Sequence, residues 1–278
     1  MITQQIKKVN IIVQFKTMCY NVPEVFRLQK YAFFIDIDGT LYTDGTVCGK
    51  NKEAIRNCIS KGHLVFINTA RSMSIIPDEV SAVDFSGYVS ALGCYIVLGK
   101  EIIFETVIPL PEVAEIFDYF NNSGRLIHLE GNRLFFSNRE ENSDKITTVK
   151  NGKELLEKYP GEKIGKIYVP GTLNKEENEW LGTKYNLYCH PNYAEFCVKG
   201  NSKATGIAKV MDYLGLDIKN SVAIGDSIND IEMMEAAGIA AAMGNSADQV
   251  LKCADIITCE ARDGGVAQAI NEITGEKI

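Results

Sequence analysis

Short apolar runs and amphipathic segments alternate in the part of the chain that follows residue 30. Phe33, Phe34 and Ile35 form one such run, and the runs at 64–68 and 88–91 also have the length of buried strands. Residues 51–62 carry apolar side chains at helical spacing, and a second helix is expected at 73–82. Strands that alternate with helices predict βαβ units and a parallel sheet.

The pattern changes in the middle of the chain, where strand-like segments flank short turns. These segments predict hairpins over 95–107, 125–137 and 186–198. Helices are expected at 111–122, 150–158 and 175–181, and one further strand at 166–170. Hairpins mixed with helices predict an antiparallel sheet with helices on one face. We interpret this region as a second domain that is inserted into the first.

Alternating strands and helices return after residue 202. Strands are expected at 221–224, 239–243 and 255–258, and helices at 202–216, 228–237, 246–253 and from about 266. The sequence therefore predicts an α/β core from residues 31–92 and 193–278 and an α+β insertion at 93–192. Residues 1–30 form an N-terminal extension whose role stays open.

Polar residues gather where the predicted parallel strands end, which is the edge at which open α/β sheets bind ligands. They are Asp36 and Asp38 after the first strand, Thr69 and Arg71 after the second, and Asp226 and Asp230 after a later one. Lys203 stands at a helix start. Several aspartates at one sheet edge repel each other unless a cation or a proton compensates them. Oxygen ligands without histidine or cysteine favour Mg²⁺ over zinc.

With Mg²⁺ in place, these residue types are those of a phosphoryl-transfer site. A carboxylate can act as a nucleophile, and a second acid can transfer protons. A threonine hydroxyl and a lysine ammonium can hold the oxygens of a phosphoryl group. Alone, each residue has a simpler explanation, such as an Asp-Gly turn at Asp38-Gly39 or a helix cap at Asp226.

Four segments together resemble the motifs of the haloacid dehalogenase superfamily. They are DIDGTL at 36–41, the strand that ends at Thr69, Lys203 in NSKATG, and GDSIND at 225–230. The run AAGIAAAMGNS at 236–246 resembles the Cof-like phosphatase branch of that superfamily. The resemblance implies a Rossmann-like core with a mobile cap, and the insertion between the second and third motifs is in the position of a C2 cap.

The resemblance also implies a role for each residue. Asp36 is the nucleophile and Asp38 the general acid and base. Thr69, Ala70, Lys203 and Asn229 bind phosphate. Asp36, the backbone carbonyl of Asp38 and Asp226 hold Mg²⁺, and Asp230 supports them. The second motif reads Thr69-Ala70-Arg71 where the family has Thr-Gly-Arg, and Arg71 is open between a substrate contact and a structural ion pair.

Composition narrows the choice of partners. The 278 residues carry a net charge of -7, which argues against nucleic acid or an anionic membrane as the main partner. Eight cysteines without a Cys-x-x-Cys pair indicate reduced thiols in a cytoplasmic protein. No apolar run is long enough for a membrane span. The expected partner is a small phosphate ester, and the protein is expected to be a monomer or a homodimer.

The main prediction is thus a Mg²⁺-dependent phosphatase for a small phosphorylated metabolite, with a sugar phosphate as the expected class. A phosphomutase is the alternative within enzymes, because it needs the same site and a cap that keeps water away. A non-catalytic signalling module with an acidic Mg²⁺ pocket is an alternative of another class.

Overall fold

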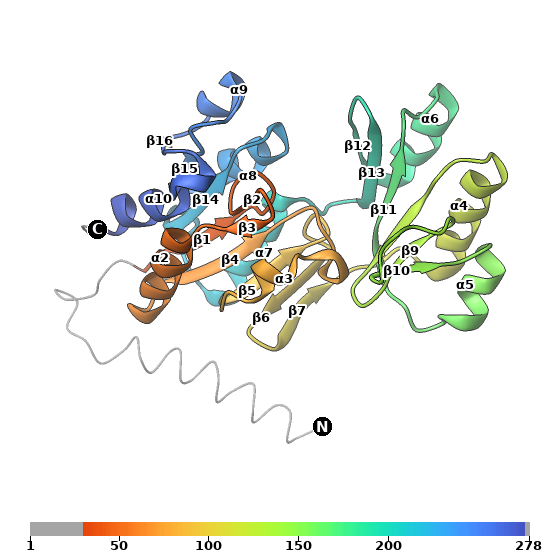
Figure 1. The fold of residues 1–278 in the computed structure, drawn as a ribbon, viewed down its shortest axis with the longest axis horizontal. Helices are drawn as coiled ribbons and strands as arrows, with labels where there is room; N and C mark the ends of the chain where they lie inside the picture. Colours follow the sequence, from red (N-terminus) through yellow and green to blue (C-terminus); the bar gives the residue numbers. More distant parts are fainter. Residues whose placement is uncertain (1–29, 276–278) are drawn as a thin grey trace, which may run out of the picture. The chain divides into compact units, whose positions relative to one another are not determined.

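The structure, a computed structural model, describes residues 30–275. The expected N-terminal extension therefore lies outside the described residues, except for Lys30. Two sheets dominate the described part, and helices pack on both of them (Figure 1). A separate two-stranded ribbon, β2 (Tyr42–Thr43) with β3 (Thr46–Val47), follows the first strand, and the turn Asp44-Gly45 joins its strands.

The first sheet has eight strands in the order β16-β15-β14-β1-β4-β5-β6-β7. Pairing is parallel from β16 to β5 and antiparallel for β6 and β7. The strands are β1 (Ala32–Ile35), β4 (Leu64–Asn68), β5 (Gly87–Ser90), β6 (Tyr95–Leu98), β7 (Glu101–Glu105), β14 (Ser221–Gly225), β15 (Ile239–Ala242) and β16 (Ile256–Ile257). The strand order reverses at β1, and such a switch point is where ligands bind in open α/β sheets.

Side chains of β1 alternate between the two faces of this sheet, and each face has its own apolar core. Phe33 and Ile35 pack with α2 (Gly49–Ser60) and α10 (Gly265–Thr274). Ala32 and Phe34 pack with α7 (Lys203–Leu214) and α8 (Ile231–Ala236). Burial on both faces explains why the strand is apolar without interruption.

The second sheet has six strands in the order β10-β9-β8-β11-β13-β12, antiparallel except for β10 with β9. They are β8 (His128–Gly131), β9 (Phe135–Ser137), β10 (Ile146–Thr148), β11 (Ile164–Pro170), β12 (Tyr185–Cys189) and β13 (Tyr193–Val198). Helices α4 (Leu110–Asn122), α5 (Gly152–Lys158) and α6 (Lys175–Lys184) share one apolar core with this sheet. We call its other face, which carries Glu130, Lys166 and Glu195, the polar face.

Three hairpin strands lie in a different sheet from the one that a division at residues 93 and 192 would give them. The pair β6 and β7 extends the first sheet, because β6 pairs with β5. Strand β13 belongs to the second sheet, where it pairs with β11 and β12. The boundaries of the two expected domains stay a prediction. By strand pairing, the crossings between the sheets fall after β7 and after β13.

The helix expected at 73–82 is interrupted. The chain forms a 3₁₀ turn, η2 (Met73–Ile75), and the short helix α3 (Asp78–Ser81). Pro77 between them lacks an N–H and forces the preceding residue into an extended conformation, which Ile76 adopts with ψ of 130°. Short segments complete the fold: η3 (Ile218–Asn220), η4 (Ile228–Asp230), α9 (Asp248–Leu251) and η5 (Ala261–Asp263).

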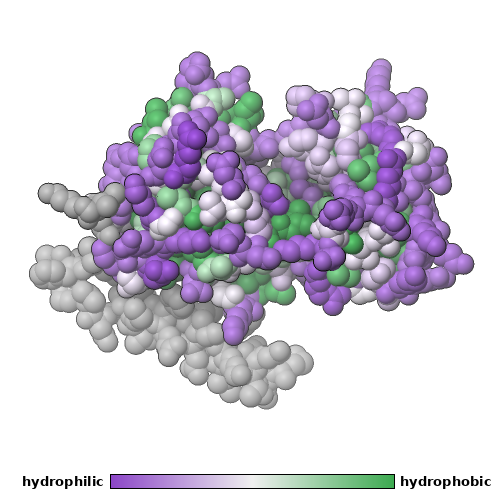
Figure 2. Space-filling model, viewed as in Figure 1, coloured by the Kyte–Doolittle hydropathy of each residue, from purple (hydrophilic) through white to green (hydrophobic). Residues whose placement is uncertain are grey.

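The face drawn in Figure 2 is mostly hydrophilic, with apolar side chains in small separate groups. The most exposed large apolar side chains of the described residues are Ile102, Ile228 and Ile257. Between residues 30 and 275, no helix combines the length and the apolar character that crossing a bilayer requires.

Candidate active site

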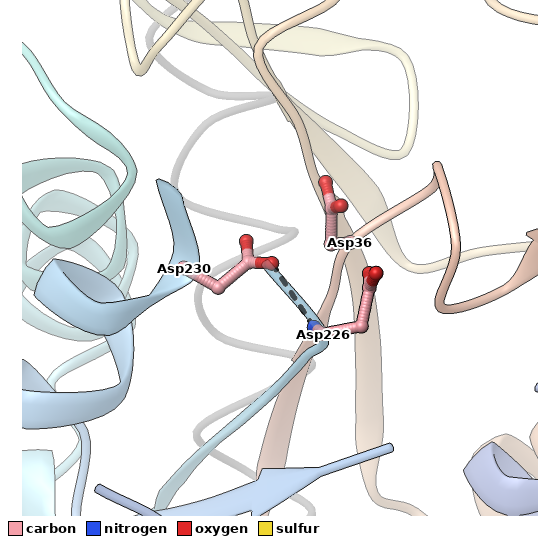
Figure 3. A group of neighbouring side chains, drawn as sticks. All are labelled: Asp36, Asp226 and Asp230. Carbon is pink, nitrogen blue, oxygen red and sulfur yellow. Dashed lines mark hydrogen bonds between the residues drawn. The ribbon is translucent and has the colours of Figure 1, made fainter. Parts of the chain in front are cut away.

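Three aspartates that are distant in the sequence gather at the carboxyl edge of the first sheet (Figure 3). Asp36 follows β1, Asp226 follows β14, and Asp230 ends the short turn η4. One carboxylate oxygen of each lies within 4.8 Å of the others. Strands β1 and β14 are parallel neighbours, so the residues that follow them emerge side by side.

Lys203 lies between two of these carboxylates as the first residue of α7. Its Nζ donates to Oδ1 of Asp36 at 2.6 Å and to Oδ1 of Asp230 at 2.7 Å. Ser202 and Thr205 form a reciprocal capping box that fixes the helix start, and hence the origin of the lysine side chain. Burial opposes the charge of Lys203, but the two aspartates raise its pKa, so the ammonium stays protonated.

The charges of this cluster are not balanced. Burial and the charge of Asp230 raise the pKa of Asp36 to about 7, although Lys203 acts in the opposite direction. One ammonium is shared by two carboxylates and cannot offset both. With Asp226, three carboxylates and one ammonium give a formal charge of −2. A divalent cation would neutralise this charge and favour the ionised form of Asp36.

Asp226 is held in place by the loop that follows β1. Oγ1 of Thr40 donates to Oδ1 of Asp226 at 2.6 Å. Gly39 has φ of +81°, and a Cβ at this position would lie 2.3 Å from Oδ2 of Asp226. Glycine is therefore needed here for its backbone conformation and for the close approach. Burial raises the pKa of Asp226, and the hydrogen bond from Thr40 opposes this shift.

Asp230 is already saturated with hydrogen bonds. Its Oδ2 accepts from the backbone N–H of Asp226 at 3.1 Å and from the N–H and hydroxyl of Ser227 at 3.0 Å each. Its Oδ1 accepts from Lys203. Asp230 thus shapes the loop that carries Asp226.

The donor set suits a hard divalent cation. Among the described residues, the acidic group of Asp36, Asp226 and Asp230 contains neither histidine nor cysteine, whereas zinc sites usually contain one or both. Both carboxylate oxygens of Asp230 already accept hydrogen bonds, so Asp36 and Asp226 are the side chains of this group that could hold an ion. Their oxygens are ligands that Mg²⁺ prefers.

Thr69 and Ala70 follow β4, which pairs with β1 on the side opposite β14. Thr69 is buried, and its Oγ1 accepts from the backbone N–H of Arg71 at 3.1 Å. The methyl group of Ala70 packs on a small apolar cluster that includes Leu92 and Cys94. Any contact of Ala70 with phosphate would therefore come from its backbone.

Arg71 forms an ion pair with Asp38. Its Nε donates to Oδ2 of Asp38 at 2.7 Å and its Nη2 donates to Oδ1 at 2.8 Å. Its Nη1 donates to the carbonyl oxygen of Ile75 at 3.0 Å, which fixes the plane of the guanidinium. The hydrogen bonds to Asp38 raise the pKa of Arg71 against the effect of burial. Asp38 is an exposed carboxylate beside the buried Asp36.

Asn229, expected near the phosphate, is exposed on the loop between β14 and α8. The two sheets are linked elsewhere at this edge, because the hydroxyl of Ser74 donates to the carbonyl oxygen of Gly131 at 2.8 Å.

Sequence reasoning missed the buried charges of the polar face. Nζ of Lys166 lies 3.0 Å from Glu130 and 2.6 Å from Glu195. Oε2 of Glu130 also accepts from the backbone N–H of Ser72, at 3.2 Å, in the loop that carries Arg71. The available signal was a charged residue inside each apolar strand segment, on the face opposite Ile167 and Phe196. Only the pairing of β8, β11 and β13 brings these charges together.

Comparisons with known proteins identify the family and the fold. The family model of the haloacid dehalogenase-like hydrolases matches residues 33–270. The protein YkrA of Bacillus subtilis (strain 168), which is named as a phosphatase only provisionally, is 27% identical to this chain over 259 residues. The alignment covers 86% of this chain and 96% of YkrA. YcsE of the same organism is a 5-amino-6-(5-phospho-D-ribitylamino)uracil phosphatase, and it is 28% identical to this chain over 250 residues. The alignment covers 85% of this chain and 92% of YcsE.

Solved structures share the fold. The sugar phosphatase BT4131, a member of HAD subclass IIB, aligns with a TM-score of 0.72 at 24% identity. The alignment covers 88% of this chain and 99% of that one. At this level of identity, the similarity establishes the common fold, with its parallel-sheet core.

Proposed function

Because the chain belongs to the haloacid dehalogenase-like hydrolases, we propose that it is a Mg²⁺-dependent phosphatase for a small phosphorylated metabolite, of the sugar phosphate class. Its relatives include named phosphatases that match over most of the chain, and hydrolysis of phosphate esters is their common reaction. The buried group of three aspartates and one lysine at the sheet edge is the observation that carries the proposal.

In the proposed reaction, an oxygen of Asp36 attacks the phosphorus, and the bond from phosphorus to the leaving oxygen breaks. Asp38 gives a proton to the leaving alcohol, so that the product departs neutral. Asp38 then takes a proton from water as the water attacks the aspartyl-phosphate on Asp36. This second step releases inorganic phosphate and restores the free carboxylate.

Lys203 and Thr69 would contact the oxygens of the phosphoryl group. Lys203 lies at hydrogen-bond distance from the attacking carboxylate, so its charge is close to the phosphorus in any in-line arrangement. Asp36, Asp226 and the backbone carbonyl of Asp38 would hold Mg²⁺, which supplies positive charge for the phosphoryl oxygens. Asp230 and Thr40 keep Asp226 oriented for this role.

The polar face supports a hydrophilic leaving group. Lys166, Glu130 and Glu195 make this face charged, and the hydrogen bond between Glu130 and Ser72 places it beside the loop of Arg71. The neighbouring aromatic rings of Tyr168 and Tyr193 stack at 4.9 Å and give that face a flat apolar part. A phosphorylated polyhydroxy compound has the matching chemistry.

A screen of phosphate esters tests the proposal. The purified chain is incubated with sugar phosphates and p-nitrophenyl phosphate in Mg²⁺, and inorganic phosphate is measured. We expect phosphate release that stops with EDTA and returns when Mg²⁺ is added in excess. Full release in metal-free buffer would contradict the metal requirement. Conversion of a sugar phosphate to an isomer without phosphate release would indicate a phosphomutase, and the absence of any turnover would contradict an enzyme.

A further inference from the structure

The buried ion group of the polar face contains two carboxylates for one ammonium. Nζ of Lys166 lies 2.6 Å from Oε2 of Glu195 and 3.0 Å from Oε1 of Glu130. All three side chains are almost fully buried. Lys166 and Glu195 alone would form a neutral pair, and a further buried carboxylate is costly unless other contacts compensate it. A contact of Glu130 outside this ion group is therefore expected.

That contact is made with the loop at 71–75, which follows β4 of the first sheet. Oε2 of Glu130 accepts from the backbone N–H of Ser72 at 3.2 Å, and both residues are buried. The carbonyl oxygen of the next residue, Gly131, accepts from the hydroxyl of Ser74 at 2.8 Å. Two neighbouring residues of β8 thus hold one short loop of the other sheet.

This loop determines where the side chain of Arg71 begins. The peptide group between Arg71 and Ser72 is held on both sides, because its N–H donates to Glu130 and its carbonyl oxygen accepts from the backbone N–H of Ala91 at 2.8 Å. The guanidinium of Arg71 then holds the carboxylate of Asp38 with two hydrogen bonds, at 2.7 and 2.8 Å. A continuous series of contacts therefore runs from the second sheet to Asp38.

We propose that Glu130 is a positioning residue for Asp38, acting through Ser72 and Arg71, so that contact of the second sheet with the loop prepares Asp38 to protonate the leaving group. The inference rests on the proposed phosphatase function. Glu130 acts without touching the substrate, because one of its oxygens faces Lys166 and the other accepts from Ser72. The surplus carboxylate of the ion group thereby has a role in the reaction.

The proposed role has a consequence that depends on the ester. The alkoxide of a sugar phosphate is a poor leaving group and needs a proton from Asp38, whereas p-nitrophenolate leaves without one. The value of kcat/KM reports the steps up to formation of the aspartyl-phosphate, in which the alcohol departs. Loss of positioning should therefore lower kcat/KM for a sugar phosphate and spare p-nitrophenyl phosphate. A purely structural role of Glu130 would lower both values alike.

Steady-state kinetics in Mg²⁺ gives the first test. In Glu130→Ala, we expect kcat/KM for the best sugar phosphate to fall by about tenfold and that for p-nitrophenyl phosphate to change by less than about twofold. Glu130→Gln keeps an oxygen that can accept from Ser72 and should recover part of the loss. In an Arg71→Ala background, Glu130→Ala should cause no further fall, because no guanidinium is left to position. Equal losses on both esters, or independent effects of the two substitutions, would overturn the proposal.

Glu177→Ala is the matched control for the loss of a buried carboxylate. Glu177 and Glu130 are each 3% exposed. Glu177 also accepts from one backbone N–H, that of Asn174 at 2.8 Å, and pairs with one cation, Arg125, but it lies in α6 on the opposite face of the sheet. Its substitution should leave the ratio of the two kcat/KM values unchanged. The same change of ratio in this variant would assign the effect to general destabilisation and overturn the proposal.

Amide hydrogen exchange tests the contact itself without any substrate. The N–H of Ser72 is protected while Glu130 accepts from it, so this amide should exchange at least about tenfold faster in Glu130→Ala and at the wild-type rate in Glu177→Ala. Unchanged exchange in Glu130→Ala would overturn the role of Glu130. If the wild-type chain had no turnover on any ester, the proposed function would fail and the role for Asp38 with it, while the exchange rates would still decide whether Glu130 holds the loop.

Discussion

Arg71 holds the carboxylate of Asp38 with two parallel hydrogen bonds, at 2.7 and 2.8 Å, and thereby fixes the side chain proposed to transfer protons. The guanidinium is itself fixed by the carbonyl oxygen of Ile75. Such fork-to-fork pairs set orientation as well as distance. Both side chains are partly exposed, so the pair contributes little to stability. Its effect should be on the reaction.

Substitution of Arg71 should separate positioning from substrate binding. In Arg71→Ala, Asp38 loses its orientation, and we expect kcat to fall by about tenfold or more with a smaller change in KM. Arg71→Lys keeps the positive charge but not the two parallel hydrogen bonds, so its kcat should lie between that of Arg71→Ala and that of the wild type. Steady-state kinetics on one good ester decides the question. A raised KM with unchanged kcat would show instead that Arg71 contacts the substrate.

Asp36→Asn should remove the nucleophile and leave the fold intact. The asparagine has nearly the same shape, and we expect turnover to fall by at least about 10³-fold. Because burial raises the pKa of Asp36, the protein disfavours its charge, so the melting temperature in EDTA at pH 8 should not decrease. Phosphate release and thermal unfolding are measured on the same preparation. Appreciable turnover in this variant would remove Asp36 from the mechanism.

Gly39→Ala should weaken the metal site. The new Cβ would lie 2.3 Å from Oδ2 of Asp226 at a backbone φ of +81°. We expect a higher Mg²⁺ concentration for half-maximal activity, together with a loss of about 1–2 kcal/mol from backbone strain. Gly45→Ala is the matched control, because Gly45 has φ of +80° and no atom within 4 Å of the new Cβ. It should lose similar stability and keep its Mg²⁺ response. Equal Mg²⁺ responses in both variants would contradict the role of this close approach.

The polar face should make the protein sensitive to acid. Burial opposes the ionisation of Glu195, but Lys166 and His190 lower its pKa to about 2 from the usual value of 4.5. A lowered pKa means that this carboxylate contributes stability above about pH 4.5 and loses the contribution as pH falls towards 2. This difference between the two pKa values of Glu195 corresponds to at most about 3 kcal/mol in the free energy of unfolding.

Urea unfolding at several pH values tests this contribution. Glu195→Gln should be less stable than the wild type at pH 7 and should lose less stability between pH 5 and pH 3. Glu157→Gln, which changes an exposed side chain in a helix, serves as the control and should follow the wild-type curve. If Glu195→Gln also followed the wild-type curve, the ion pair with Lys166 would have no net effect on stability.

Local signals determined much of the fold. The uninterrupted apolar runs of β1, β4 and β14 predicted strands buried on both faces, and the polar residues after them predicted a ligand-binding edge. The motifs from Asp36 to Leu41 and from Gly225 to Asp230 identified the family, and the match over residues 33–270 confirms it. Such features are readable because each depends on the order of residues within one short segment.

Tertiary structure alone decided which distant groups meet. No local pattern indicated that Arg71 would hold Asp38 or that Lys166 would be buried between Glu130 and Glu195. The placement of β6 and β7 in the first sheet depended equally on pairing with β5. Contacts of this kind follow from strand order and register, and these depend on how the whole chain buries its apolar faces.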